Sequence, residues 1–148
     1  MVKYAVESLN KIGELCHNNG LRLAFHNHHQ EFQLLDDQVI YDYILENTDP
    51  ELITMEVDLY WAYKGGVDIQ QYFEKYPGRF ELVHVKDSYD SNDLQSFACV
   101  GSGIIDFQAL FSSRDIAGFK HIIVEHDLPE NEKECARSSI EYLKGLTF

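Results

Sequence analysis

The chain has few basic residues. Lys and Arg number 12 against 25 Asp and Glu, so the formal net charge is −13. A negative field of this size repels phosphate backbones, and we expect no nucleic-acid partner. No apolar run approaches the roughly 18 residues that cross a membrane. The N-terminal residues alternate charge and apolarity on a helical period, unlike a signal peptide. These absences predict a cytoplasmic protein that binds neither nucleic acid nor membrane.

Cysteine and proline are scarce as well. Cys16, Cys99 and Cys135 are widely spaced and form neither a disulfide framework nor a CxxC metal motif, so we expect reduced, mostly buried thiols. No Pro- or Gly/Ser-rich linker divides the chain, and 45% of its residues are hydrophobic. The sequence therefore predicts one globular domain over residues 1–148, long enough to bury a sizeable core.

Hydrophobic periodicity predicts helices that alternate with short apolar strands. The expected helices cover residues 2–19, 39–47, 69–76, 107–117 and 130–144, and the expected strands cover residues 21–27, 52–58, 80–86 and 121–125. Asp68 and Asp106 are suited to cap two of the helices, and Gly118 is suited to end one. Alternation of this kind favours a parallel α/β sheet with crossover helices. A long polar stretch over residues 87–103 is expected to be a functional or mobile loop.

Each predicted strand ends in groups that can bind a divalent metal. The groups are His26 and His28, Glu56 and Asp58, His84 and Asp87, and Glu125 and Asp127. Parallel strands place their carboxyl ends at one edge of the sheet, so these side chains could converge. The pattern predicts a metal site.

Four segments resemble the sugar phosphate isomerase/epimerase family, which has the xylose isomerase-like barrel, and they occur in the family's order. They are LAFHNHHQEF at 23–32, EVDLYWAYKGGVD at 56–68, LVHVKDS at 82–88 with VGSGIIDF at 100–107, and IIVEHD at 122–127. The resemblance covers nearly the whole chain but only the C-terminal half of the barrel. It implies a TIM-barrel-like α/β fold of about half a barrel, with four βα units after an N-terminal helix.

The resemblance also implies one divalent cation, such as manganese, cobalt, zinc or magnesium. Asp58, His84 and Glu125 match the family's usual Asp, His and Glu ligands. The fourth ligand is usually a Glu, and His26 occupies that position, which is a departure from the family. Two imidazoles and two carboxylates suit a borderline cation better than Ca²⁺. Taken singly, His84 could be a core histidine and Glu125 a salt-bridged carboxylate.

A site of this kind supports proton transfer next to the carbonyl of a small sugar or polyol. Glu125 is the first candidate base, and Glu31 is the nearest spare carboxylate for a second, although it could be a surface acid. Lys86 should point to the same side as His84 and could polarise a substrate oxygen, or it could pair with Asp87 or Glu56. Trp61 could pack against a sugar face or the core, and His28 is expected to contact the substrate or support a ligand.

Several functions remain open. The first is a metal-dependent isomerase or epimerase, and the second is a dehydratase of a keto-polyol, which shares the same first step. The third is a catalytically inactive half-barrel fragment or sugar-binding module. An abasic-site endonuclease on the related barrel is disfavoured by the −13 charge. Phosphate binding at Gly101–Gly103 is disfavoured because Asp106 caps the helix that follows.

A closed barrel of eight strands needs about 250 residues, and this chain has half the strands. An open sheet leaves two bare edges, which favour association. We therefore expect a homodimer or larger homo-oligomer that completes the barrel. An open half-barrel with covered edges is the alternative.

Overall fold

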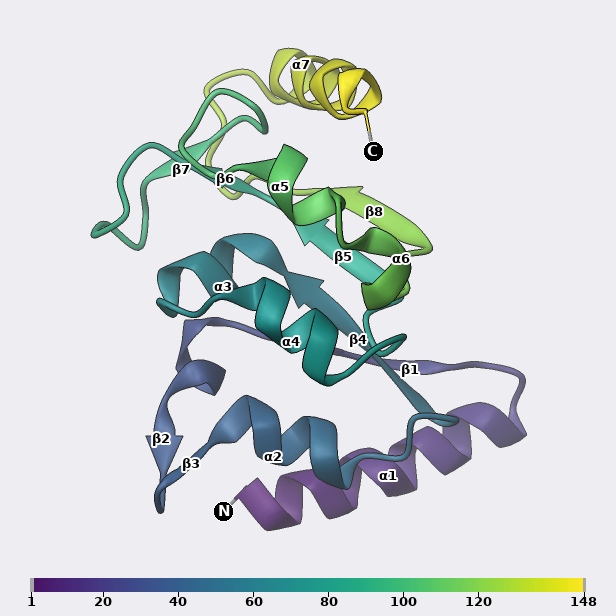
Figure 1. Cartoon of the computed structure of the whole chain (residues 1–148). Coiled ribbons are helices and arrows are strands. Elements are labelled where there is room, and N and C mark those ends of the chain that lie inside the picture. Colours follow the sequence, from purple (N-terminus) through teal and green to yellow (C-terminus); the bar gives the residue numbers. More distant parts are fainter. Residues whose placement is uncertain (1, 148) are drawn as a thin grey trace.

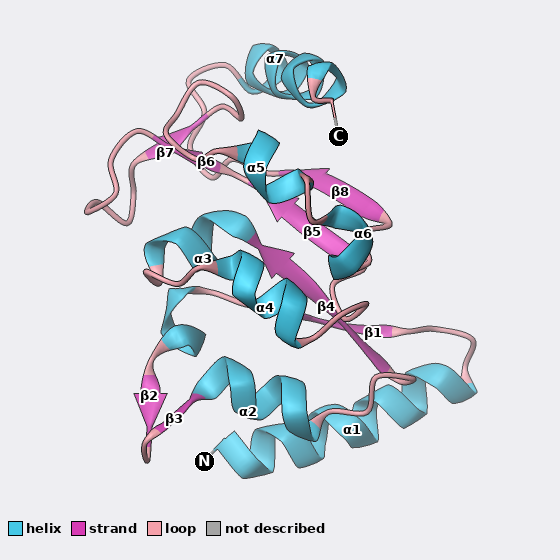
Figure 2. Cartoon of the chain, in the orientation of Figure 1, coloured by secondary structure: helices cyan, strands magenta, loops and turns pink. Residues whose placement is uncertain are grey.

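Four parallel strands form the main sheet of the computed structural model, which describes residues 2–147. The strands are β1 (Leu23–His26), β4 (Ile53–Asp58), β5 (Leu82–Val85) and β8 (His121–Val124). Their order is β1-β4-β5-β8, so chain order and spatial order agree and the sheet does not close. The arrowheads of β4, β5 and β8 point to the same end of the sheet in Figures 1 and 2. The predicted half-barrel of parallel strands is confirmed.

Helices follow the strands along the chain (Figure 1). They are α1 (Val2–Asn18), α2 (Ile40–Asn47), α3 (Leu59–Lys64), α4 (Ile69–Lys75), α5 (Phe107–Phe111), α6 (Arg114–Ala117) and α7 (Glu132–Gly145). The short elements between them are η1 (His29–Phe32), β2 (Leu34–Leu35), β3 (Gln38–Val39), β6 (Asp87–Ser88) and β7 (Phe97–Ala98). None of the helices within residues 2–147 has the length and apolar character needed to span a bilayer.

The two faces of the sheet differ because side chains alternate along each strand. On β4, Ile53, Met55 and Val57 are fully buried in the hydrophobic core beneath the helices. The intervening positions of β4 carry Thr54, Glu56 and Asp58. The apolar set anchors the sheet to the helices, and the polar set lies on the face that a closed barrel would enclose.

The predicted helix over residues 107–117 is divided into α5 and α6. The Ser112 hydroxyl donates a hydrogen bond to the Ala109 carbonyl at 2.6 Å. Hydrogen bonds of this kind, from a side chain to a nearby backbone carbonyl, compete with the backbone hydrogen bonds that would continue the helix. Gly118 ends α6 with a φ of 88° in the left-handed region, as its predicted stop position requires. The predicted caps are confirmed: Asp68 accepts from the Gln70 amide and Asp106 from the Ala109 amide. Helix α3 was not predicted.

Two of the three cysteines are bonded to each other, so the expectation of three reduced thiols is wrong. A disulfide joins Cys99 to Cys135, whose Cα atoms lie 5.3 Å apart, and Cys16 is free. The two residues are 36 positions apart in sequence. They meet because the loop after β7 packs against α7, where the Val100 amide donates to the Ser139 hydroxyl at 3.0 Å. Spacing along the sequence carries no signal for this contact.

Candidate metal centre

Four side chains predicted as ligands converge at the carboxyl end of the sheet. One ligand atom from each of His26, Asp58, His84 and Glu125 lies within 4.8 Å of the others. His26 and Asp58 end their strands, His84 lies opposite Asp58 in the register, and the Glu125 amide continues the β5–β8 pairing to the Val85 carbonyl. We refer to these four residues as the candidate metal site.

The distances within the candidate metal site match those between ligands of one cation. His26 Nε2 lies 3.2 Å from Asp58 Oδ2, and His84 Nδ1 lies 2.8 Å from Glu125 Oε2 and 3.9 Å from Asp58 Oδ2. Ligand atoms at about 2.0–2.2 Å from a common ion are separated by about 3–3.5 Å. Two imidazole nitrogens and two carboxylate oxygens therefore fit a borderline divalent cation.

Asp58 is held so that one oxygen remains for the site. Its side chain is fully buried, and its Oδ1 accepts the Trp61 amide at 2.9 Å as the N-cap of α3. Asn27 fixes the backbone on both sides: Asp58 N–H donates to Asn27 Oδ1 at 3.0 Å, and Asn27 Nδ2 donates to the Asp58 carbonyl at 3.3 Å. The second carboxylate oxygen, Oδ2, faces His26 and His84.

Glu56 orients His84 from the side opposite Glu125. His84 Nε2 lies 3.0 Å from Glu56 Oε1, whereas His84 Nδ1 faces Glu125 and Asp58. A histidine that ligates through one nitrogen and donates through the other to a carboxylate is the usual arrangement in metal sites. Sequence reasoning noted Glu56 as a strand-end acid and as a possible partner of Lys86, but not as a residue that orients His84. Its position two residues before Asp58, on the same side of β4, was the available signal.

Lys86 is buried beside the candidate metal site, with only 2% of its surface exposed. Its Nζ lies 3.1 Å from Glu125 Oε2, 3.1 Å from Asp127 Oδ2 and 3.9 Å from Asp58 Oδ2. The rings of Tyr60, Trp61 and Phe97 lie 5.4–5.6 Å from the same atom. The alternative in which Lys86 pairs with Asp87 or Glu56 is wrong, because Asp127 and Glu125 are its partners.

Two pKa values at the site reflect these contacts. The hydrogen bond to Asp58 raises the pKa of His26, and partial burial opposes that rise. Burial acts to raise the pKa of Glu125, but Lys86 and His84 outweigh it, so the pKa lies below its ordinary value. Glu125 is therefore ionised near neutral pH and able to accept a proton. A proton competes with a cation for His26, and we expect acid to weaken metal binding.

The remaining predicted residues have different surroundings. The His28 ring centroid lies 4.9 Å from that of His26 and 5.3 Å from that of Trp61. This places His28 and Trp61 beside the candidate metal site. Glu31 accepts the His28 amide at 2.6 Å and caps η1. Its role as a second base stays a prediction.

Asp87 does not belong to the candidate metal site, although it is one of the strand-end acids that could have converged there. Its carboxylate is fully buried and accepts four backbone amides, those of Ser88, Gly101, Gly103 and Ile105. A Cβ at Gly103 would lie 2.3 Å from Asp87 Oδ1, so only glycine permits this approach. The Gly101–Gly103 amides that a phosphate would need are thus occupied.

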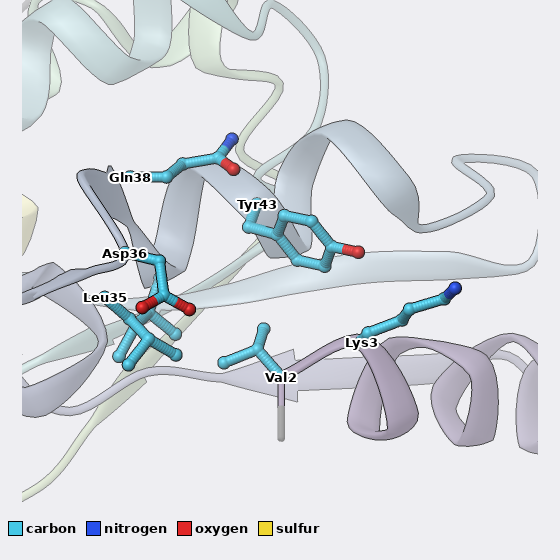
Figure 3. A pocket seen from close by; sticks show the side chains of 7 residues that line it. Val2, Lys3, Leu35, Asp36, Gln38 and Tyr43 are labelled. Atoms are coloured by element: carbon cyan, nitrogen blue, oxygen red, sulfur yellow. The ribbon is translucent and has the colours of Figure 1, made fainter.

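A separate hollow of about 220 Å³ lies between the start of α1 and the β2–β3 hairpin. Lys3, Asp36 and Tyr43 are among its lining residues (Figure 3). It shares no residue with the candidate metal site and brings together no set of catalytic groups.

Residues 2–146 match the family described as Xylose isomerase-like TIM barrel. An inosose dehydratase of Clostridium perfringens is 26% identical over 98% of this chain and 54% of its own length. An inosose dehydratase of Geobacillus thermodenitrificans is 27% identical over 78% of this chain and 43% of its own length. The chain therefore spans about half the length of these relatives.

Solved structures agree with this assignment. A sugar phosphate isomerase/epimerase from Parabacteroides distasonis is 29% identical, with a TM-score of 0.82 over 97% of this chain and 51% of that chain. The IolI protein with a bound zinc atom has a TM-score of 0.80 over 98% of this chain and 55% of its own, at 16% identity. The second likeness shows the fold alone. The resemblance predicted from the four sequence motifs is confirmed.

Proposed function

Because the chain belongs to the xylose isomerase-like TIM barrel family, we propose that His26, Asp58, His84 and Glu125 bind one divalent cation. The site then removes a proton next to the carbonyl of a keto sugar or keto-polyol. The convergence of the four ligand atoms within 4.8 Å carries this proposal. The IolI protein, which has a similar fold, binds a zinc atom, and this supports a divalent cation in this chain. Mn²⁺, Co²⁺ and Zn²⁺ suit the donor set best, and Mg²⁺ less well.

When bound, the cation supplies a Lewis acid that polarises the substrate carbonyl. Glu125 takes the proton from the neighbouring carbon, because its carboxylate is ionised and lies at the open edge of the site. Asp58 is fully buried and anchored by Asn27 and the Trp61 amide, which suits a ligand that does not move. Trp61 and His28 form an aromatic wall against which the apolar face of the substrate can pack.

The relatives named inosose dehydratase favour dehydration as the outcome. An inosose is a cyclic polyol with one keto group. After the proton leaves, a hydroxyl on the next carbon must depart as water, and it needs a proton. Lys86 can donate that proton and recover one from Glu125, whose Oε2 lies 3.1 Å away. Glu125 and Lys86 thus both return to their starting protonation states at the end of one catalytic cycle.

Isomerisation or epimerisation is the second candidate. The 29% identical isomerase/epimerase structure favours it. The first step is the same, but the proton returns to another carbon or to the other face of the same carbon. Lys86 would then hold a substrate oxygen and would not protonate a leaving group.

Exchange with D₂O tests the shared first step. The chain is incubated with an inosose and Mn²⁺, Co²⁺ or Zn²⁺, and deuterium entry next to the carbonyl is followed by NMR. We expect exchange with at least one cation and its loss in Glu125→Gln, whereas Cys16→Ser exchanges like the wild type. Formation of a dehydrated or rearranged product distinguishes the two outcomes. No exchange by well-folded wild-type chain would favour the alternative of an inactive half-barrel or sugar-binding module.

We also propose that a second copy of the chain covers the bare edges of the sheet. Within residues 2–147 the edge strands β1 and β8 each have a single neighbouring strand, and Ile122 and Ile123 on β8 are 46% and 36% exposed. Unpaired strand edges favour pairing with another chain. Two copies would supply eight strands. Sedimentation at micromolar concentration should show a dimer or larger assembly, and a stable, well-folded monomer would contradict this proposal.

A further inference from the structure

A second cluster of possible ligands lies near the candidate metal site but shares none of its residues. One atom from each of Cys99, His126 and Cys135 lies within 4.8 Å of the others. Cys99 follows β7, His126 lies just after β8, and Cys135 is buried in the first turn of α7. We call these three residues the sulfur cluster. Its two cysteines are joined as a disulfide in the described structure.

A hollow of about 410 Å³ opens beside the sulfur cluster. All three cluster residues line it, together with Tyr89, Glu134 and Ser138. The space gives a small reductant or an ion a path to the two sulfur atoms, and it leaves room for a water molecule next to them.

We propose that the sulfur cluster is a second metal site, which binds Zn²⁺ through Cys99, Cys135 and His126 when the disulfide is reduced. Two thiolates and one imidazole, with water in the fourth position, form a known tetrahedral zinc arrangement. In a reducing compartment disulfides are rare, and cysteines that lie together more often bind metal or take part in catalysis. The ligand set is softer than that of the candidate metal site, which has two carboxylates, so the two sites select different cations.

The change of state balances in electrons and protons. A dithiol reductant transfers two electrons and two protons to the Cys99–Cys135 bond, gives two thiols and becomes a cyclic disulfide itself. Zn²⁺ then displaces the two thiol protons to solvent as it binds the sulfur atoms. A small disulfide compound that takes two electrons from the thiolates and two protons from solvent becomes a dithiol, releases Zn²⁺ and restores the crosslink.

His126 can join the two sulfurs at small structural cost. Its Nδ1 accepts the Leu128 amide at 3.2 Å, and this is the hydrogen bond that ligation would remove or rearrange. Leu128 is 72% exposed, so its amide can bond to water instead. The ring also lies 6.0 Å from Phe97, two residues before Cys99. The His126 ring thus lies beside the segment that carries Cys99, and one of its nitrogens lies within 4.8 Å of both sulfur atoms.

Cobalt titration tests the proposal, because thiolate ligands give Co²⁺ an intense near-ultraviolet charge-transfer band that nitrogen and oxygen ligands do not. The metal-free chain of residues 1–148 is reduced with a dithiol without oxygen, freed of reductant and titrated with Co²⁺. We expect the thiolate band in reduced wild type and its loss in the oxidised wild type, a comparison that involves no substitution. Absence of the band in the reduced, folded chain would overturn the proposal.

Variants locate the signal. Cys99→Ser with Cys135→Ser should lose the band while circular dichroism and Mn²⁺ binding are retained, and Cys16→Ser, the matched control, should keep it. His126→Ala should weaken Co²⁺ binding at the band at least tenfold. A band that survives the double substitution or disappears in Cys16→Ser would assign the thiolate to Cys16 and contradict the proposal. Displacement of Co²⁺ by Zn²⁺ should abolish the band.

Discussion

The two ends of the sheet use charge in opposite ways. At the amino end, Glu81 lies between two basic side chains, 2.5 Å from Arg22 and 3.0 Å from Lys120, each contacting solvent. At the carboxyl end, one buried lysine, Lys86, faces three carboxylates, those of Asp58, Glu125 and Asp127, and a fourth carboxylate, Glu56, contacts His84. Among these groups, cations outnumber carboxylates at the amino end, and the carboxyl end has an excess of negative charge that a divalent cation would neutralise.

The difference in charge suggests that residues at the amino end of the sheet serve stability and that residues at the carboxyl end serve function. Exposed ion pairs such as those of Glu81 each contribute about 1 kcal/mol or less to folding. Several carboxylates gathered around one lysine and two imidazoles oppose folding by repulsion and are retained where a site needs them. In barrels of this kind the carboxyl end carries chemistry and the amino end carries stability. Substitutions at the two ends should therefore have different consequences.

The largest effect is expected for Lys86→Met. In the proposed dehydration Lys86 donates the proton to the leaving hydroxyl, so its loss should lower turnover by about 10²–10⁴-fold, whereas metal affinity stays the same or rises because a positive charge has been removed. Turnover and Mn²⁺ titration measure the two quantities. Lys120→Met at the amino end is the matched control and should leave both unchanged. Equal loss of turnover in the two variants would contradict the division between the ends.

Asp87→Asn should affect stability and not metal binding, although Asp87 lies at the carboxyl end. The amide nitrogen of asparagine would face backbone donors that now bind a carboxylate oxygen, those of Gly101 and Gly103. Leaving such donors unsatisfied costs about 3 kcal/mol of unfolding free energy, measurable by urea unfolding. A large loss of Mn²⁺ affinity in the folded variant would show that Asp87 belongs to the site.

Glu56→Gln should weaken metal binding by about 10–100-fold, the usual effect of removing a carboxylate that orients a ligating histidine. The reason is the 3.0 Å contact between Glu56 Oε1 and His84 Nε2. Calorimetric titration with Mn²⁺ measures the change. Glu81→Gln makes the same chemical substitution at the amino end and should have no effect on metal affinity.

The smallest effect is the pH dependence of the Glu81 ion pairs. Burial acts to raise the pKa of Glu81, but the hydrogen bonds from Lys120 and Arg22 outweigh it and hold the pKa below its ordinary value. Its contribution, about 1 kcal/mol or less, is therefore present above the ordinary glutamate pKa and is lost as pH falls through the lowered one. Urea unfolding of wild type and Glu81→Gln should differ at pH 7 and converge in acid. A difference that persists in acid would assign the effect to packing.

Much of the fold could be predicted because it depends on local patterns. The apolar runs that became β4 and β5, and the caps at Asp68 and Asp106, are visible in short windows of sequence. The position of Asp58 at a strand end was also sufficient to predict convergence with His84.

Other features depend on contacts between distant segments. The Cys99–Cys135 disulfide requires the loop after β7 to meet α7, and nothing in either segment alone encodes this. Asp87 and Lys86 are adjacent in sequence but point in different directions, so their partners follow from the packed structure and not from spacing. Helix α3 differs from these features, because its cap is local: the Asp58 carboxylate accepts the Trp61 amide three residues later, and sequence reasoning gave Asp58 only a metal-binding role.

Mn²⁺ titration of the metal-free, oxidised chain tests the central claim most directly. The account predicts one tightly bound Mn²⁺ per wild-type chain and no comparable binding in Asp58→Ala or His84→Ala, with circular dichroism unchanged. Wild-type protein that binds no cation, or an Asp58→Ala variant that binds it equally well, would contradict the claim that these side chains hold a common ion.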